Sequence, residues 1–246
     1  MKLEKNERID DLEYQNLKII QNTDGFCFGM DSVLLSDFAK EIKSGSKIID
    51  LGTGTGILGI LLSAKTQNTQ IVGVEIQEEV AKMAQKSILL NHLENRFTII
   101  CENINHLKER YEPGLFDAIV TNPPYKKLGT GATNEVDKKL ISRHEVSATL
   151  EDFIAISSYL LKDRGNLYMV HRPERLTDIL VNLRQHRLEP KELKLVHPYE
   201  QKAPNLILIK ATKNAKPFLT IDKPLYIYRK NGEYTDEILK IYHKET

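Results

Sequence analysis

The sequence contains few cysteines and no long apolar segment. Its two cysteines, Cys27 and Cys101, cannot build a disulfide framework, and neither they nor the seven histidines have metal-ligand spacing. No apolar run approaches the roughly 18 residues of a membrane span, and no signal-peptide pattern is visible. We therefore expect a soluble, cytoplasmic protein that holds no metal and contacts no membrane.

Charge is nearly balanced, with a formal net charge of +1 over 246 residues. Residues 1–142 carry a small excess of acidic side chains, and residues 143–246 carry a small excess of basic ones. A solvated surface explains this asymmetry as readily as a phosphate-binding face does. Hydrophobic residues make up 41% and charged residues 28%, which is typical of one large globular domain with additions.

A strand, a glycine-rich loop and a helix follow one another from residue 47 to residue 65. The apolar run 47–51 predicts a buried strand, and Gly52, Gly54 and Gly56 let the backbone approach a ligand closely. A second predicted strand, 70–75, ends in Glu75, whose carboxylate can accept hydrogen bonds from both hydroxyls of a ribose. The segment predicts a nucleotide pocket, although a purely structural glycine turn stays open.

Two cofactor classes compete for this pocket. Gly54-x-Gly56-x-x-Gly59 satisfies the dinucleotide-binding fingerprint, which favours NAD. Asp50 argues against it, because a carboxylate at the loop entrance would repel a pyrophosphate at the helix N-terminus. S-adenosylmethionine has no phosphate and carries a sulfonium and an ammonium, so an acidic entrance favours it.

A second motif, Asn122-Pro123-Pro124-Tyr125, follows the predicted buried strand 116–120. Ligands of open α/β sheets bind beyond the carboxyl ends of strands, where this tetrapeptide lies. Two consecutive prolines stiffen the turn and would hold the Asn122 amide, the Pro123 carbonyl and the Tyr125 ring close together. Such a group suits a flat, neutral, nitrogen-bearing substrate. The alternative is a rigid surface turn without a ligand.

With these motifs the chain resembles the NPPY class of S-adenosylmethionine-dependent methyltransferases. Asp-x-Gly-x-Gly-x-Gly at residues 50–56 is similar to their first motif, and Glu75 is similar to their second. The resemblance implies an α/β class I fold with a Rossmann-like, seven-stranded, mostly parallel sheet and helices on both faces. The alternation of predicted strands and helices from residue 47 to about 190, followed by a final antiparallel pair, agrees with that fold.

The resemblance also assigns residues. It implies catalysis by Asn122, Pro123, Pro124 and Tyr125, with acceptors on the two N–H bonds of an aromatic amine and Tyr125 stacked on its ring. It implies a cofactor site made of Asp50, Gly52, Gly54, Gly56, Glu75, Ile76, Asn103, Ile104 and Asn122. Asn103 stands where the family usually has an acid that binds the cofactor adenine. Glu102 is the substitute, and a plain strand-end turn is also open for either residue.

Further segments narrow the resemblance to the tRNA1(Val) adenine-37 N6-methyltransferase family. They are residues 28–35, 143–145, 171–176 and 196–199. This family implies methyl transfer to the N6 amine of an adenine in tRNA. The implied RNA contacts are Arg143, His144, Arg172 and Arg175, although the last two could simply pair with nearby acids.

The order of the predicted elements suggests three parts. Residues 1–45 would form a hairpin and a helix, in which residues 1–15 are loosely docked and strand 17–21 pairs with 26–28. Residues 46–212 would form the methyltransferase core with an active-site lid at 126–147, and residues 213–246 would extend the same domain. Enzymes that methylate ribosomal RNA bases or release-factor glutamine share the tetrapeptide, so both remain alternatives. An RNA-binding scaffold without catalysis is the third.

Overall fold

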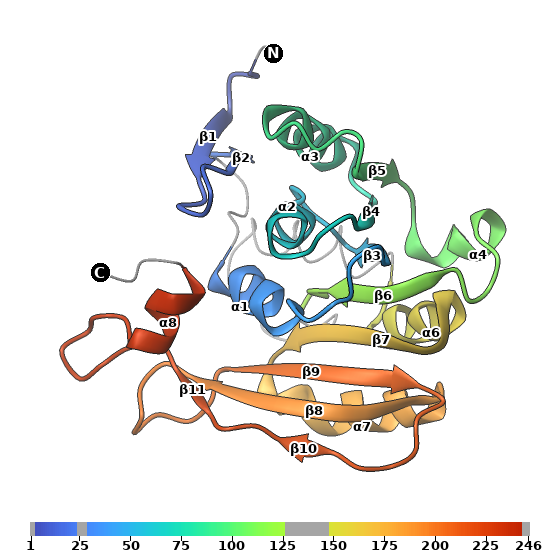
Figure 1. Ribbon diagram of the computed structural model, residues 1–246, viewed down its shortest axis with the longest axis vertical. Helices are drawn as coiled ribbons and strands as arrows, with labels where there is room; N and C mark the ends of the chain where they lie inside the picture. Colours follow the sequence, from blue (N-terminus) through green and yellow to red (C-terminus); the bar gives the residue numbers. More distant parts are fainter. Residues whose placement is uncertain (1–2, 24–28, 126–147, 243–246) are drawn as a thin grey trace, which may run out of the picture.

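The computed structural model describes residues 3–23, 29–125 and 148–242 (Figure 1). Within them the chain builds one nine-stranded sheet and a separate two-stranded ribbon. The seven central strands follow the order β5-β4-β3-β6-β7-β9-β8. The order reverses between β3 and β6, which is where doubly wound sheets open a ligand crevice.

The first half of the sheet is parallel. Its strands are β3 (Lys47–Leu51), β4 (Gln70–Glu75), β5 (Phe97–Cys101) and β6 (Phe116–Thr121). Between them lie α2 (Ile57–Lys65), α3 (Glu78–Leu90), the 3-10 turn η1 (Ile104–His106) and α4 (Leu107–Arg110). Apolar residues run almost uninterrupted through β3 because both faces of a parallel sheet are covered. Because these strands are parallel, their carboxyl ends lie at one edge of the sheet.

The second half contains the predicted antiparallel pair. It comprises α6 (Leu150–Leu160), β7 (Leu161–His171), η2 (Pro173–Arg175), α7 (Leu176–Gln185), β8 (Leu188–His197) and β9 (Leu206–Lys213). Strand β9 runs antiparallel to both β7 and β8, so β8 is parallel to the core strands. Thr149-x-x-Asp152 has the spacing that predicts a capping box, and helix α6 begins with it: Thr149 and Asp152 bond to each other's backbone N–H.

Helices cover both faces of the sheet, as predicted (Figure 1). Helices α1 (Met30–Phe38), α2 and α3 share one apolar cluster, while α6 and α7 belong to the other. The C-terminal segment adds β10 (Thr220–Ile221) and β11 (Leu225–Tyr226), both paired in parallel with β8, and α8 (Asp236–Ile241). No helix in the described ranges is long and apolar enough to cross a membrane.

The N-terminal prediction was wrong in two respects. The part of segment 1–15 that the structure describes, from residue 3, is not merely loosely docked, since β1 (Glu7–Asp11) pairs antiparallel with β2 (Lys18–Asn22). Buried Leu12 and an ion pair between Glu7 and Lys86 on α3 attach this charged ribbon to the core. The predicted partner segment 26–28 lies outside the described residues. Asp31 and Ser32 are residue types that predict a helix cap, yet helix α1 begins at Met30 and its cap is Gly29.

Strand β7 begins earlier than its sequence predicts. The residues Asp163-Arg164-Gly165 are typical of a turn and predict a strand only at 166–170, yet the strand extends from Leu161. Its register against β6 shifts between the pairs Phe116–Leu161 and Ala118–Asn166, and Arg164 takes a positive φ of 63° inside the shifted stretch. The turn-forming residues therefore make an irregularity within the strand instead of ending it.

Candidate active site

Strand register brings the two motifs together. Leu51 lies opposite Val74 on β4 and opposite Thr121 on β6. The Thr121 hydroxyl donates a hydrogen bond to the Leu51 carbonyl at 2.8 Å. Gly52 and Asn122 each follow directly after these paired residues, so the glycine loop and the Asn-Pro-Pro-Tyr segment open at the same edge of the sheet.

The glycine loop is held by a buried carboxylate. Gly52, Gly54 and Gly56 all have positive φ, between 57° and 87°, which side chains rarely tolerate. Glu75 is 3% exposed and accepts hydrogen bonds from the Gly54 N–H at 3.0 Å and the Gln77 N–H at 2.9 Å. A carboxylate has about four acceptor positions, so the two that remain suit ribose hydroxyls.

Asp50 is fully buried at the base of the same loop. The Thr53 hydroxyl donates a hydrogen bond to its Oδ2 at 2.5 Å, whereas its Oδ1 has no partner among the described residues. Burial raises the pKa of Asp50 to about 7; the Thr53 bond opposes the shift and the charge of Glu75 adds to it. A buried carboxylate oxygen without a donor is costly, and a cationic ligand would satisfy it. The residues present therefore fit S-adenosylmethionine.

The third glycine of the fingerprint serves packing. A Cβ atom added to Gly59 would stand 2.2 Å from Cζ of Phe97 on β5, far inside van der Waals contact. Only glycine allows α2 to lie this close to that ring. Gly59 is therefore required by the helix–strand distance and not by a ligand.

In the predicted adenine-binding turn, the side chains of Asn103 and Glu102 make local hydrogen bonds. The Asn103 side-chain oxygen accepts a hydrogen bond from the Asn105 N–H at 3.0 Å and caps η1. The Glu102 carboxylate accepts one from the Asn103 N–H at 2.8 Å. These bonds match the strand-end alternative, and a cofactor contact by either side chain stays a prediction. Ile104 is buried, and Ile76 is exposed at the end of β4.

The Asn-Pro-Pro-Tyr segment is fixed through Tyr125. Pro123 is buried, Asn122 and Tyr125 are half-buried, and the Tyr125 hydroxyl donates to Asp31 Oδ2 at 2.5 Å. Burial raises the pKa of Tyr125, the Asp31 carboxylate adds to the rise, and a hydrogen bond with Asn122 opposes it. Tyr125 is therefore a neutral donor at physiological pH.

Arg172 and His171 lie beside the Tyr125 ring. The Arg172 guanidinium carbon lies 4.9 Å from the centre of its ring, and the His171 ring lies 5.2 Å away. Stacking of Tyr125 on a substrate ring stays a prediction. In this arrangement the arginine already occupies a position over the tyrosine.

Sequence reasoning missed Asp31 and His171 as individual residues of this site. His171 is 0% exposed; its Nδ1 accepts the Arg172 N–H at 2.7 Å, and its Nε2 has no partner among the described residues. Burial, and next the charge of Arg175, lowers the pKa of His171 to about 4, so the ring is neutral. Both residues belong to segments that carried the family resemblance, which was the available signal.

The four predicted RNA contacts have different positions relative to the site. Arg172 lies at the site and donates to the Asn205 carbonyl at 3.0 Å. Arg175 pairs with Asp178 at 2.8 Å, which is the alternative that the sequence left open. Arg143 and His144, with the predicted lid, lie outside the described residues. In the described ranges no group of three or more His, Cys, Asp or Glu side chains could hold a metal ion.

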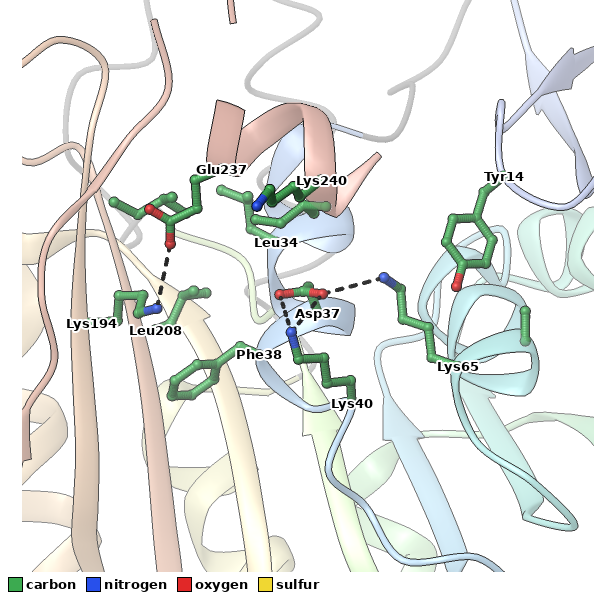
Figure 2. Close-up of a pocket in the computed structure, with 13 residues that line it drawn as sticks. Tyr14, Leu34, Asp37, Phe38, Lys40, Lys65, Lys194, Leu208, Glu237 and Lys240 are labelled. Carbon is green, nitrogen blue, oxygen red and sulfur yellow. Dashed lines mark hydrogen bonds and ion pairs between the residues drawn. The ribbon is translucent and has the colours of Figure 1, made fainter. Parts of the chain in front are cut away.

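A cavity of about 600 Å³ lies at the other end of α1 (Figure 2). It is lined from α1, α2, β9 and α8, and it includes none of the predicted site residues. Lys65, whose side chain is 4% exposed, pairs with Asp37 at 3.6 Å. Burial lowers the pKa of Lys65, and Asp37 counters that shift. This ion pair joins α1 to α2.

The sequence was compared with family models and known proteins. The model of the methyltransferase small domain matches residues 28–186. The chain belongs to the methyltransferase small domain family. The predicted class I methyltransferase fold and its cofactor, S-adenosylmethionine, are thereby confirmed.

Two curated relatives span almost the whole chain. A tRNA1(Val) (adenine(37)-N6)-methyltransferase of Porphyromonas gingivalis is 27% identical over 94% of this chain and 93% of its own length. The protein of the same name from Haemophilus influenzae is 26% identical over 93% and 94%.

Two solved structures share the fold. A predicted O-methyltransferase of Agrobacterium tumefaciens superposes with a TM-score of 0.70 at 20% identity, covering 87% of this chain and 96% of its own. TYW2 of Pyrococcus horikoshii, solved with MeSAdo, superposes with a TM-score of 0.59 at 12% identity, covering 86% and 73%.

Proposed function

We propose that this methyltransferase transfers a methyl group from S-adenosylmethionine to the N6 amine of an adenine in tRNA. The observation that carries the proposal is the register of β3, β4 and β6, which puts the Asn122 segment next to the glycine loop. The names of the full-length relatives support the choice of tRNA adenine as the substrate.

When bound, S-adenosylmethionine supplies a methyl group on a positively charged sulfur. The protein's own contribution begins with Glu75, which would hold the ribose hydroxyls while bracing the loop at Gly54. Asp50 would supply negative charge to the cationic end of the cofactor, because its Oδ1 has no other partner among the described residues. Glycines 52, 54 and 56 would leave room for the ligand against the backbone.

The exocyclic amine of adenine is a poor nucleophile because its lone pair is delocalised into the ring. Two acceptors, the Asn122 side-chain oxygen and the Pro123 carbonyl, would bind its N–H bonds and localise that lone pair. The stiff Pro-Pro turn keeps these acceptors in place, so positioning and hydrogen bonding lower the barrier without a strong base. Asp31 and His171 contribute indirectly, because they fix the position of Tyr125.

The base must leave any stack to reach this segment. Arg172 lies against Tyr125 at the site and is placed to contact the RNA around that base. Its guanidinium can pair with a phosphate or stack on a base, since both suit a planar cation.

The proposal is tested by methylation of an unmodified tRNA pool, followed by digestion and mass spectrometry of the nucleosides. N6-methyladenosine is expected with the wild-type chain and not with Asn122→Ala. A parallel reaction with a release factor and with ribosomal RNA separates the alternatives. Methylated glutamine or another methylated base, without N6-methyladenosine in tRNA, would refute the proposed substrate.

A further inference from the structure

Four tyrosines form a row on the C-terminal side of the molecule. Tyr228 and Tyr234 stack with ring centres 5.4 Å apart, and Tyr234 and Tyr242 stack at 5.8 Å. Tyr199 continues the row, 5.4 Å from Tyr228. We call these four residues the tyrosine ladder.

The ladder lies at the edge that carries the active site. Strand β8 is parallel to the core strands and β11 is parallel to β8, so both end at the edge where Asn122 lies. Tyr199 follows the end of β8, and Tyr228 follows the end of β11. The bond from Arg172 to the Asn205 carbonyl joins the β8–β9 loop to the site.

The inner end of the ladder approaches the same site. Helix α8, which ends just before Tyr242, packs against α1 (Figure 1). Burial raises the pKa of Tyr242, and the charge of Asp31 contributes to the rise. Asp31 is also the acceptor for the Tyr125 hydroxyl. The row thus leads from the neighbourhood of the catalytic segment to the surface.

Buried isoleucines and a backbone bridge hold the segment behind the ladder, whereas the rings of the ladder are partly open. Ile227, Ile238 and Ile241 are buried, and Tyr228 forms an antiparallel bridge with Tyr234. The ladder residues Tyr228, Tyr234 and Tyr242 are half-buried, and Tyr199 is 38% exposed. A groove of about 420 Å³ lies along the central pair, lined by Tyr228, Arg229, Gly232, Glu233, Tyr234 and Leu239. Tyr228, Tyr234 and Tyr242 also pack against the main apolar cluster, so only part of each ring is open to a ligand.

We infer that the tyrosine ladder binds unpaired RNA nucleotides that flank the target adenine. Aromatic rings provide stacking platforms for splayed-out bases, and basic side chains bind the connecting phosphates. Lys202 and Lys230 are exposed in the two loops that carry Tyr199 and the central pair, together with Glu200 and Glu233, while Arg229 pairs with Asp236. The two lysines can bind the phosphates that connect stacked bases, and this charged surface does not suit an apolar protein partner. The inference rests on the proposed function, because it names the surface that holds the same substrate.

The test measures RNA affinity and methyl transfer by three single variants. Tyr199→Leu removes an exposed ring, Tyr199→Phe keeps the ring, and Phe218→Leu removes an aromatic ring outside the ladder that is 74% exposed. Affinity is measured by fluorescence anisotropy with an unmodified tRNA transcript and with an RNA stem-loop carrying an unpaired adenine. Calorimetry with S-adenosylmethionine and thermal unfolding report whether each variant is folded.

Tyr199→Leu is expected to weaken RNA binding about tenfold and to raise KM for tRNA with kcat retained. Its salt dependence should stay that of the wild type, because stacking releases no counterions. Tyr199→Phe and Phe218→Leu should bind as the wild type does. Unchanged affinity in Tyr199→Leu, or an equal loss in Tyr199→Phe, would overturn stacking on the ladder.

Cross-linking gives a second readout on the unaltered chain. Ultraviolet cross-links to the stem-loop are expected in peptides that contain Tyr199, Tyr228 or Tyr234. Cross-links confined to other surfaces, such as α3, would overturn the inference. If the wild-type chain methylates no tRNA, the proposed function fails; the affinity of the stem-loop for Tyr199→Leu still decides the ladder separately.

Discussion

The two halves of the active-site edge contain different types of residue. On the β3–β5 side, the predicted cofactor site consists of acids and glycines within one continuous stretch of chain, and Glu75 accepts hydrogen bonds from backbone N–H groups. On the β6–β8 side, aromatic and basic side chains come from segments far apart in sequence. Tyr125, Asp31 and Arg172 meet there from three different elements. Backbone N–H groups and glycines suit a small cofactor, whereas a large RNA requires side chains from several separate segments.

Asn122→Ala is expected to have the largest effect, because it removes an acceptor that binds the amine N–H while the amine attacks the methyl group. Methyl transfer should fall about a hundredfold or more while cofactor affinity stays near the wild-type value. Steady-state kinetics together with calorimetry would show this. Loss of cofactor binding with turnover intact would place Asn122 on the cofactor half instead.

Glu75→Ala tests the cofactor half. Affinity for S-adenosylmethionine should fall about thirtyfold, because hydrogen bonds to a buried charged acceptor are lost. RNA affinity should remain near that of the wild type if the halves are separate. Glu75→Gln is the matched control: its amide keeps one acceptor and should lose less affinity. Equal loss in both variants would show that the charge, and not the acceptor, matters.

Asp50→Asn tests the cofactor half by comparing the thermal stability of variant and wild type at two pH values. The pKa of Asp50 is about 7 in the folded chain, against an ordinary value of 3.8 for an aspartate side chain. The stability that a protonated Asp50 contributes is full below about pH 4 and is lost as pH rises to about 7. The cofactor-free variant should therefore unfold at a higher temperature than the wild type at about pH 8 and match it at about pH 4.

The same variant should bind S-adenosylmethionine about tenfold more weakly at about pH 8, because it lacks the charge that the cationic ligand attracts. Thermal unfolding at both pH values and calorimetry provide the measurements. An equal difference in unfolding temperature at both pH values would contradict an effect of Asp50 ionisation.

Arg172→Ala and Arg175→Ala form the mildest test, on the substrate half. Arg172 lies over Tyr125, whereas Arg175 is paired with Asp178. Arg172→Ala should weaken tRNA binding about fivefold and reduce the salt slope by about 1. Arg175→Ala should leave both nearly unchanged. Equal effects of the two variants would contradict the assignment drawn from the geometry.

Local patterns predicted the structural elements around the glycine loop and the start of α6 well. The strand–glycine–helix stretch, Glu75 at the end of β4 and the capping box at Thr149 are each encoded within a few residues of sequence. Parallel pairing then needed only the alternation of strands and helices. These features depend on short-range backbone preferences that one sequence displays directly.

Long-range contacts could not be predicted in the same way. The bond from Tyr125 to Asp31 joins residues 94 positions apart, and the pairing of β1 with β2 depends on docking against α3. The irregularity in β7 arises because tertiary pairing overrides turn-forming residues at 163–165. No local spacing reports such contacts, which appear only when the sheet is assembled.

The clash between position 59 and Phe97 has a consequence for enzyme design and motif searching. The third glycine of the fingerprint is required because a helix packs closely against a strand. Binding sites for methyl donors and for nicotinamide cofactors can therefore both contain it. The discriminating residue is the acid at position 50, two residues before the loop. Converting one cofactor class into the other should therefore begin at residue 50 and leave residue 59 untouched.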